Sequence, residues 1–370
     1  MELRDFGKRS GLKVAPVSIG AMRLPTEDNQ GQELLQYAID AGMRYIDTSS
    51  HYLGQKSQVI VGEAVKGEYR DRVIVSNKAG RRRYPDDWTA EDFVGQIKYQ
   101  MGEMDLDYLD FFQAWGMSNM DQWEQINQPD DMVDGIRMAM DEGLIGHTGF
   151  TTHMNAEDLV NKVLPEADWV EIILISYNML NRSSEPALAK MHELDIGTIV
   201  MNPVGGGKLA EDSPVLMEIA EEVGAVSVAD LAIRYVLANP NVDTIACGMR
   251  KKQDVDDSVA SAERGPLTAE QVETVNEAMA DLARDNVDFC TACGYCMPCP
   301  QEIKIPKLMG AIYEDRFLGL EKAARNAYNR GPDDEPKADA CVQCGQCEDK
   351  CPNNLPIMQE LAAAHEKYVK

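Results

Sequence analysis

Positive charge and long apolar runs are both scarce in this sequence. Its 370 residues include 36 Lys and Arg against 62 Asp and Glu, so the formal net charge is −26. A chain this acidic repels the phosphates of nucleic acids and of anionic membranes. Its basic runs, such as Arg81–Arg83, are too short to form a patch that binds nucleic acid. We therefore expect no nucleic acid partner and no membrane partner.

No stretch of about 20 apolar residues is present, so the sequence predicts no transmembrane helix. The N-terminus, MELRDFGKRSGLKV, lacks the apolar centre of a signal peptide. We expect a cytoplasmic protein in a reducing compartment, where cysteines rarely form structural disulfides. Hydrophobic residues still make up 44% of the chain, which is enough for a sizeable core and excludes a disordered protein.

The cysteines divide the chain. Eight of the nine lie between Cys290 and Cys351, and Cys247 stands alone in a segment that predicts a buried strand. This shift in composition predicts a large domain over residues 1–282 and a small cysteine-rich domain over 283–370. The length agrees, because one α/β barrel takes roughly 250 residues and leaves an appendage here.

The first domain alternates between short apolar runs and helical patterns. Near-continuous apolar strands separated by helices are typical of a parallel sheet, and eight such units predict an α/β fold, the closed (β/α)8 TIM barrel. An open doubly wound sheet is the alternative, but the residues after the first strand, RLPTEDN, contain no Gly-rich fingerprint. Before that strand, LRDFGKRSGLKVAP predicts a β-hairpin that closes the bottom of the barrel. The predicted strands are Val17–Met22, Tyr45–Thr48, Val73–Lys78, Tyr108–Trp115, Gly146–Thr151, Val170–Tyr177, Thr198–Val204 and Asp243–Met249. The predicted helices are Gly31–Ala41, Gln58–Lys66, Ala90–Met104, Gln128–Glu142, Ala156–Leu164, Glu185–Leu194, Pro214–Leu237 (as two helices) and Lys252–Ala262.

Three residues with complementary chemistry follow neighbouring strands. Asp47 and Tyr52 come at the end of the second strand, and Lys78 ends the third. A phenol with a pKa near 10 is a poor acid at neutral pH, but a nearby ammonium lowers that pKa, and a carboxylate holds the ammonium in place. Such a trio is a general acid that protonates an alkoxide. Each residue alone also fits a structural role, as a cap, a loop aromatic or a solvated strand end.

The strand-end motifs resemble those of a known family. IDTSSHY, VSNK, GFTTH, SYNMLNR, NPVGGGKL and ACGMR occur in this order over about residues 1–270 and are similar to those of the aldo-keto reductases. The resemblance implies a (β/α)8 barrel that transfers a hydride from a nicotinamide cofactor to a carbonyl. Asp47, Tyr52 and Lys78 match the Asp, Tyr and Lys of the family's catalytic tetrad, with Tyr52 as the proton donor.

The fourth tetrad residue departs from the family. Trp115 stands where a His is expected at the end of the fourth strand. An indole has a single N–H donor and cannot shuttle protons, which places ordinary aldehyde reduction in question. His51 and His153 are the candidates that could replace the missing imidazole, and each also fits a loop or capping role.

The resemblance also implies a nucleotide site. Thr151 and Thr152 stand at the family's Ser-Asn pair, and glycines after the seventh strand let backbone N–H groups approach a phosphate. Gly248-Met249 replaces the family's Lys-Ser grip on a 2′-phosphate, so NADP and NAD are both open and a flavin is not excluded. The expected binding residues are Thr151, Thr152, Tyr177, Asn178, Pro203, Gly205, Gly206, Gly207, Lys208 and Arg250.

The cysteine runs repeat one pattern. Both contain C-x₂-C-G-x-C with a later Cys-Pro, and the second has the spacing C-x₂-C-x₂-C-x₃-C-P of bacterial ferredoxins. Zinc sites use paired C-x₂-C hooks without the third cysteine, so we expect two 4Fe–4S clusters rather than zinc. Because the fourth cysteine serves the other cluster in such ferredoxins, Cys290, Cys293, Cys296 and Cys351 form one set, and Cys341, Cys344, Cys347 and Cys299 form the other. Helical patterns follow from Gln301, over Lys307–Asn329 and from Asn353. This tail resembles the helical ferredoxin-type domains fused to a subset of aldo-keto reductases.

Two functions follow from these patterns. The first is an iron–sulfur oxidoreductase that exchanges hydride with a small-molecule carbonyl and electrons with a ferredoxin-like carrier. The second is an electron-transfer or docking protein whose barrel has lost carbonyl reduction, as Trp115 suggests. Nicotinamide gives two electrons at once while a cluster passes one, so coupling in the first case needs a flavin, a radical-tolerant substrate or two clusters in sequence.

Overall fold

The computed structural model describes residues 1–284, 290, 294–332 and 334–369. Two compact units make up the chain: Met1–Gly206 with Ala232–Leu267, and Gly207–Leu231 with Thr268–Lys370. The segment that follows Gly206 is therefore grouped with the C-terminal tail. The domain boundary between residues 282 and 283 stays a prediction.

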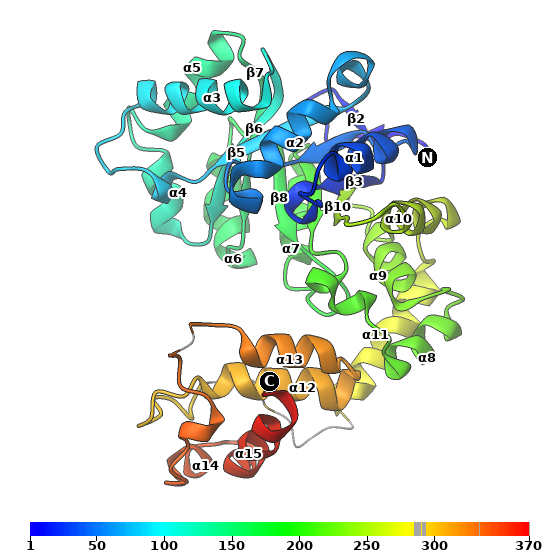
Figure 1. Cartoon of the computed structure of the whole chain (residues 1–370), viewed down its shortest axis with the longest axis vertical. Helices are drawn as coiled ribbons and strands as arrows, with labels where there is room; N and C mark the ends of the chain where they lie inside the picture. Colours follow the sequence, from blue (N-terminus) through cyan, green and yellow to red (C-terminus); the bar gives the residue numbers. More distant parts are fainter. Residues whose placement is uncertain (285–289, 291–293, 333, 370) are drawn as a thin grey trace. The chain divides into compact units, whose positions relative to one another are not determined.

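The first unit is built on a closed barrel of eight parallel strands (Figure 1). Val, Ile, Leu and Phe are the commonest apolar residues buried in these strands, and they suit strands covered on both faces. The last strand pairs with the first, with Ile245 opposite Val17, so no strand edge is left open. The predicted (β/α)8 barrel is confirmed. Its strands are β3 (Val17–Gly20), β4 (Tyr45–Asp47), β5 (Ile74–Ala79), β6 (Leu109–Met117), β7 (Ile145–Thr152), β8 (Ile172–Ser176), β9 (Gly197–Met201) and β10 (Thr244–Gly248).

Helices follow the strands as the sequence predicted. α3 (Ala90–Met104) begins at a capping box between Thr89 and Asp92, and its buried face includes Phe93 and Ile97. Helix α4 (Met120–Ile126) was not predicted. The predicted helix over Ala156–Leu164 begins as α6 (Ala156–Asp158) and continues as a π-turn over Leu159–Val163. The other helices are α1 (Gln30–Asp40), α2 (Lys56–Ala64), α5 (Met132–Asp141), α7 (Glu185–Glu193), α9 (Val228–Leu237) and α10 (Lys252–Arg264).

A hairpin closes the N-terminal end of the barrel. β1 (Arg4–Asp5) pairs antiparallel with β2 (Lys13–Val14), and Phe6 between them is fully buried. The Phe6 ring lies 5.5 Å from the ring of Tyr45 and 5.6 Å from that of Phe111, inside the barrel. Its neighbour Gly7 donates its N–H to Asp243, which immediately precedes β10. The prediction that the hairpin closes the bottom of the barrel is therefore confirmed. The opposite end, where the strands have their C-terminal ends, is where barrel enzymes have their active sites.

The described tail residues are mainly helical, as predicted. α12 (Ile305–Leu318) and α13 (Glu321–Asn329) run side by side (Figure 1). They bury Leu308, Ile312 and Tyr328 in one core with Leu361 of α15 (Ile357–Tyr368). The single helix predicted over Lys307–Asn329 is two, because Gly319 takes a left-handed φ of 63° and ends α12. Helices also start about one turn after Gln301 and Asn353. This unit contains α8 (Pro214–Glu222), α11 (Ala269–Arg284), α12 (Ile305–Leu318), α13 (Glu321–Asn329), α14 (Gln346–Asp349) and α15 (Ile357–Tyr368).

Candidate functional site

A buried ion pair lies at the C-terminal end of the barrel. Asp47 ends β4, Lys78 lies near the end of β5, and the Lys78 ammonium contacts the Asp47 carboxylate. Lys78 Nζ also donates a hydrogen bond to the carbonyl oxygen of Thr48 at 2.8 Å. Burial works to lower the pKa of Lys78, but Asp47 and Tyr52 outweigh it and raise the pKa. The ammonium therefore stays charged although the Lys78 side chain is buried.

Tyr52 joins this pair. It begins a 3₁₀ turn after β4, and Lys78 Nζ lies 4.7 Å from the centroid of its ring. The structure thus brings together the three predicted catalytic side chains. The expected direction of the Tyr52 pKa was wrong: burial raises it, and the opposing charge of Lys78 does not overcome burial. The phenol consequently holds its proton at neutral pH.

Gln113 of β6 extends the trio and was missed from the sequence. Its amide Nε2 lies 3.2 Å from Asp47 Oδ1, 2.7 Å from Ser76 Oγ and 3.1 Å from the Tyr45 hydroxyl oxygen. It is fully buried, so it orients the free oxygen of Asp47 without water. The sequence feature that could have identified Gln113 is that it is an amide side chain within the otherwise apolar run that predicted the strand.

Trp115 lies on the wall of the same site. Its ring centroid is 6.1 Å from that of Tyr52 and 5.4 Å from that of His51. Burial, and then the charge of Arg83, lower the pKa of His51, and burial lowers the pKa of His153. Of the two candidate replacements, His51 is the one placed against Trp115. His153 follows β7, where its backbone N–H donates to Met117.

The two threonines of the predicted nucleotide site end β7 and are buried. Thr152 donates its hydroxyl proton to the Met117 carbonyl oxygen at 3.0 Å, so that proton is committed. Thr151 accepts a hydrogen bond from the Gly116 N–H at 2.8 Å, which leaves its hydroxyl proton available for a ligand.

Tyr177 and Asn178 follow β8. The Tyr177 hydroxyl donates to Glu185 at 3.0 Å. Asn178 donates to the Asn202 carbonyl oxygen at 3.0 Å and accepts hydrogen bonds from the Leu180 and Asn181 N–H groups. Asn178 therefore ties the turn after β8 to the residue that follows β9.

The Gly-rich segment after β9 belongs partly to each unit. Pro203, Gly205 and Gly206 lie in the barrel unit, where the Gly206 carbonyl accepts a hydrogen bond from Arg23 at 2.7 Å. Arg23 follows the first barrel strand and was not predicted for this place. Arg250 after β10 is exposed, and its backbone N–H donates to Asp254.

Gly207 and Lys208 lie in the second unit. The Lys208 ammonium forms an ion pair with Glu314 of α12. A phosphate would therefore compete with a carboxylate for this predicted ligand.

Cysteines from both runs line one hollow in the tail. Cys299 of the first run meets Cys341, Cys344 and Cys347 of the second there, together with Cys296 and apolar side chains such as Ile303 and Leu361. Cys299, Cys341, Cys344 and Cys347 are the residues predicted for one cluster, whereas Cys296 was predicted for the other, so the crossed assignment stays a prediction. No three of the described His, Cys, Asp and Glu side chains surround a point as the ligands of a single metal ion would. A cubane differs, because each of its irons takes one thiolate.

The structure describes only some of the remaining cysteines that were predicted to bind a cluster. Cys290 and Cys351 are partly buried and pack against the tail core, and Cys293 lies outside the described residues. Gly294 and Gly345 occupy equivalent places in the two runs and have left-handed φ values of 80° and 76°. The two runs therefore share a backbone conformation as well as a cysteine spacing, because a glycine directly after the second cysteine of each run adopts a left-handed turn. Cys247 in β10 is a buried thiol, as expected, and burial raises its pKa to about 12.

Comparisons with known proteins agree with this geometry. The profile of the aldo/keto reductase family matches residues 16–280. This chain belongs to the aldo/keto reductase family. A second profile, the 4Fe-4S dicluster domain, matches residues 289–356. The chain is thus an oxidoreductase of the aldo-keto reductase type with an iron–sulfur domain, and the family implies use of NAD(P) and a small-molecule substrate.

Relatives and a solved structure match about three quarters of this chain. "Uncharacterized oxidoreductase YqkF" of Bacillus subtilis (strain 168) is 23% identical over 303 residues, covering 74% of this chain and 95% of that protein. L-galactose dehydrogenase of Arabidopsis thaliana is 24% identical over 303 residues, covering 76% and 94%. The holo form of aldo-keto reductase AKR11C1 from Bacillus halodurans superposes with a TM-score of 0.65 at 23% identity, covering 75% and 96%, which shows the shared fold. Among the described residues, no helix is long and apolar enough to cross a bilayer.

Proposed function

We propose that this chain reduces a small carbonyl compound with a nicotinamide nucleotide and exchanges electrons with a one-electron carrier through two 4Fe–4S clusters. The observation that carries the proposal is the buried contact of Lys78 with Asp47 beside the Tyr52 ring. A charged ammonium next to a phenol is what proton donation to a developing alkoxide requires.

The residues divide the work of the reduction. When bound, a reduced nicotinamide supplies the hydride that reaches the carbonyl carbon. Tyr52 gives its phenolic proton to the carbonyl oxygen, so the products are an alcohol and a phenolate. Lys78 stabilises that phenolate by its charge, and Asp47, oriented by Gln113, holds the ammonium in place. The raised pKa of Tyr52 keeps the proton on the phenol until a strongly basic oxygen develops.

The nucleotide is NADP or NAD in this proposal, with a flavin as the alternative. Thr151 has a hydroxyl proton for the carboxamide, and Tyr177 and Asn178 form the neighbouring wall. Pro203, Gly205, Gly206, Gly207, Lys208 and Arg250 would face the phosphates. Lys208 reaches a phosphate only by leaving Glu314.

Each cluster would take its thiolates from both cysteine runs. Cys299, Cys341, Cys344 and Cys347 hold one cluster, and Cys290, Cys293, Cys296 and Cys351 hold the other. Clusters supply single-electron steps, so the partner is a ferredoxin-like carrier in the reducing cytoplasm. Matching these steps to a hydride requires a flavin, a radical-tolerant substrate or the two clusters acting in sequence.

Trp115 favours a second candidate function. Its indole occupies the tetrad position where the family has an imidazole and lies against both Tyr52 and His51. A barrel without that imidazole fits an electron-transfer or docking protein in which carbonyl reduction has been lost.

An anaerobic titration separates the two. The protein is purified without oxygen and titrated with NADPH or NADH, and cluster reduction is followed by visible and electron-spin spectra. Reduction of the clusters by a nicotinamide, reversed by adding small aldehydes and ketones, supports the enzyme. Failure of both nucleotides to bind, with reduction only by ferredoxin-like donors, supports the alternative and overturns the proposed reaction.

A further inference from the structure

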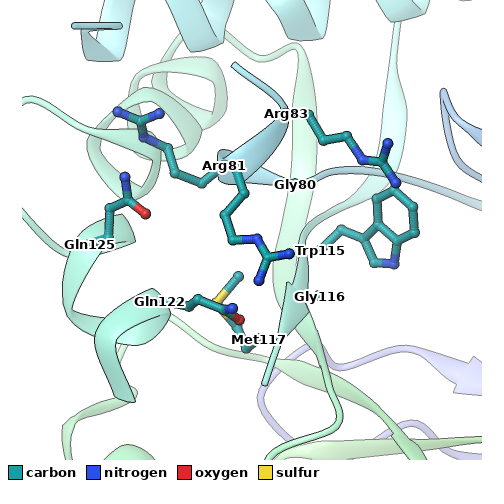
Figure 2. A pocket seen from close by; sticks show the side chains of 9 residues that line it. Gly80, Arg81, Arg83, Trp115, Gly116, Met117, Gln122 and Gln125 are labelled. Carbon is teal, nitrogen blue, oxygen red and sulfur yellow. The ribbon is translucent and has the colours of Figure 1, made fainter. Parts of the chain in front are cut away.

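A second feature of the barrel mouth has no part in the reaction described above. A hollow of about 110 Å³ opens beside Trp115, where β5 and β6 end (Figure 2). Arginines and glutamines line it, and no Asp or Glu is among its lining residues. In a chain with a net charge of −26, such a place concentrates positive potential. Its volume suits a small organic group rather than a large ligand. The lining residues are Gly80, Arg81, Arg82, Arg83, Trp115, Gly116, Met117, Gln122 and Gln125.

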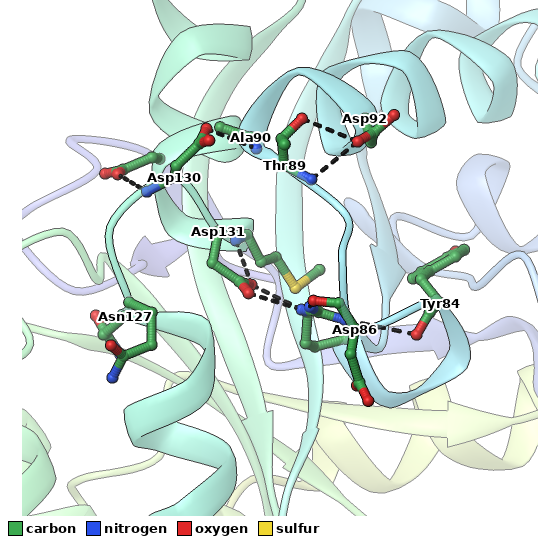
Figure 3. Close-up of polar contacts among 12 residues, drawn as sticks. Tyr84, Asp86, Thr89, Ala90, Asp92, Asn127, Asp130 and Asp131 are labelled. Carbon is green, nitrogen blue, oxygen red and sulfur yellow. Dashed lines mark hydrogen bonds and ion pairs between the residues drawn. The ribbon is translucent and has the colours of Figure 1, made fainter.

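Arg81 fixes the loop rather than offering its charge. Its Nε lies 2.8 and 2.9 Å from the two carboxylate oxygens of Asp131, and its other nitrogens donate to the carbonyl oxygens of Pro85 and Asp86. Arg81 and Asp131 are both buried. Figure 3 shows the surrounding network, in which Asp130 also accepts a hydrogen bond from the Ala90 N–H. The loop that carries the next two arginines is therefore fixed by Arg81, which binds Asp131 and also the carbonyl oxygens of Pro85 and Asp86.

Arg82 and Arg83 differ from Arg81. Both are exposed, and within the part of the chain that the structure describes neither has an acidic partner within 4 Å. The Arg83 guanidinium lies over the Trp115 ring, 5.2 Å from its centroid (Figure 2). The same indole contacts the Tyr52 ring edge-on at 6.1 Å. Two exposed cations without an acidic partner among the described residues thus line the hollow, and the indole that Arg83 contacts also contacts the proton donor.

We propose that this hollow binds an anionic group of the substrate, a carboxylate or a phosphate, through Arg82 and Arg83. The substrate is then a small carbonyl compound with an anion at one end. Trp115 contacts both Arg83 and Tyr52, so an anion held by the arginines leaves the carbonyl carbon free to lie near Tyr52. Guanidinium groups suit this role because their planar fork donates two hydrogen bonds to one carboxylate or phosphate.

The assignment of the anion to a substrate rests on the proposed function, but the anion site itself does not. Binding can therefore be measured without turnover. The iron-loaded full-length protein is titrated calorimetrically, without oxygen, with glutarate, with inorganic phosphate and with the neutral analogue glutaramide. The variants are Arg82→Met and Arg83→Met, with Arg83→Lys as the conservative change. Arg137→Met on α5 is the control, since Arg137 is exposed and pairs with Asp134 and Asp168 instead.

We expect glutarate to bind and glutaramide not to bind. Each methionine variant should weaken glutarate by about tenfold or more, as expected when a charge-assisted hydrogen bond is removed. Arg83→Lys should recover part of the loss, and Arg137→Met should change nothing. The same pattern with phosphate instead of glutarate supports the site and identifies a phosphate ester as the anionic group. Absence of binding by both anions, or unchanged affinity in both methionine variants, overturns the proposal.

Tyr52→Phe distinguishes this inference from the proposed function. The variant should keep its glutarate affinity because the hydroxyl takes no part in holding the anion. If the protein binds the anion through Arg82 and Arg83 but never reduces a carbonyl, the anion site is supported. Only the proposed reaction is then overturned.

Discussion

Lys208 and Glu314 are paired across 106 residues of sequence, one at the end of the Gly-rich segment and the other on α12 of the tail. Two more bonds strengthen this junction: the Ser213 hydroxyl donates to the Leu318 carbonyl oxygen at 2.5 Å, and the Ala323 N–H donates to Glu211 at 3.1 Å. Within the second unit, the residues from Lys208 to Ser213 are therefore held against α12 and the start of α13.

This ion pair predicts opposite effects of two substitutions on nucleotide affinity. Glu314→Gln should tighten NADPH binding several-fold, because it frees the Lys208 ammonium and removes a carboxylate that repels phosphate. Lys208→Met should weaken binding by about tenfold. Fluorescence titration with NADPH measures both. Equal affinity in the two variants would remove Lys208 from the nucleotide site.

Tyr52→Phe should abolish carbonyl reduction while nucleotide affinity stays nearly intact. Loss of a positioned general acid costs about 10²–10⁴ in rate, and the ring and its contact with Lys78 are kept. Single-turnover reduction of a carbonyl by the NADPH complex gives the rate, and the same titration as above gives the affinity. Turnover equal to wild type would refute the assignment of Tyr52 as proton donor.

The raised pKa of Tyr52 predicts the shape of the pH profile. A general acid works only while protonated, so the rate of reduction should stay level through neutral pH and fall only above the ordinary tyrosine value of 10.0. His51 and His153 have lowered pKa values, so a histidine acid would lose its proton below its ordinary pKa of 6.5. Single-turnover rates between pH 5.5 and 10.5 decide between them, since an early fall below neutral pH points to a histidine.

The fold was predictable because it depends on repetition that a linear sequence displays. Eight buried apolar runs followed by helical patterns specify a parallel barrel, and the positions of Asp47 and Lys78 at the ends of consecutive runs placed them together. The hairpin could be predicted because two short segments flank a Gly/Ser turn before the first barrel strand. Helix α4 was missed because its seven residues carry only a short apolar stripe, with Trp123 and Ile126 as its buried apolar residues.

The features of the site that could not be predicted from the sequence depend on contacts between residues that are distant in the chain. Arg81 is neutralised by Asp131, 50 residues away, so three consecutive arginines contain one structural and two exposed charges. Gln113 looked like an interruption of an apolar strand, yet it contacts Asp47. The direction of the Tyr52 pKa was misjudged because burial, which the sequence does not show, outweighs the neighbouring charge.

Trp115→His should increase reduction of neutral aldehydes by about tenfold or more, because it restores an acid–base partner beside Tyr52. Trp115→Phe is the matched control, since it keeps an aromatic wall but has no ring nitrogen. Steady-state rates with uncharged aldehydes give the comparison. If the histidine variant reduces no faster than the phenylalanine variant, the limitation of this barrel lies outside position 115.

The crossed assignment of the thiolates predicts how iron content responds to single cysteine substitutions. The protein should hold about eight irons per chain, as two 4Fe–4S clusters require. Cys299→Ser should reduce iron and sulfide content toward about four, and Cys344→Ser should give the same spectrum, because both residues line one hollow although they belong to different runs. Cys247→Ala is the control, since this thiol is buried in β10 of the barrel, and it should leave the iron content unchanged. If each run instead held its own cluster, Cys299→Ser and Cys344→Ser would damage different clusters, and electron-spin spectra of the two reduced variants would differ.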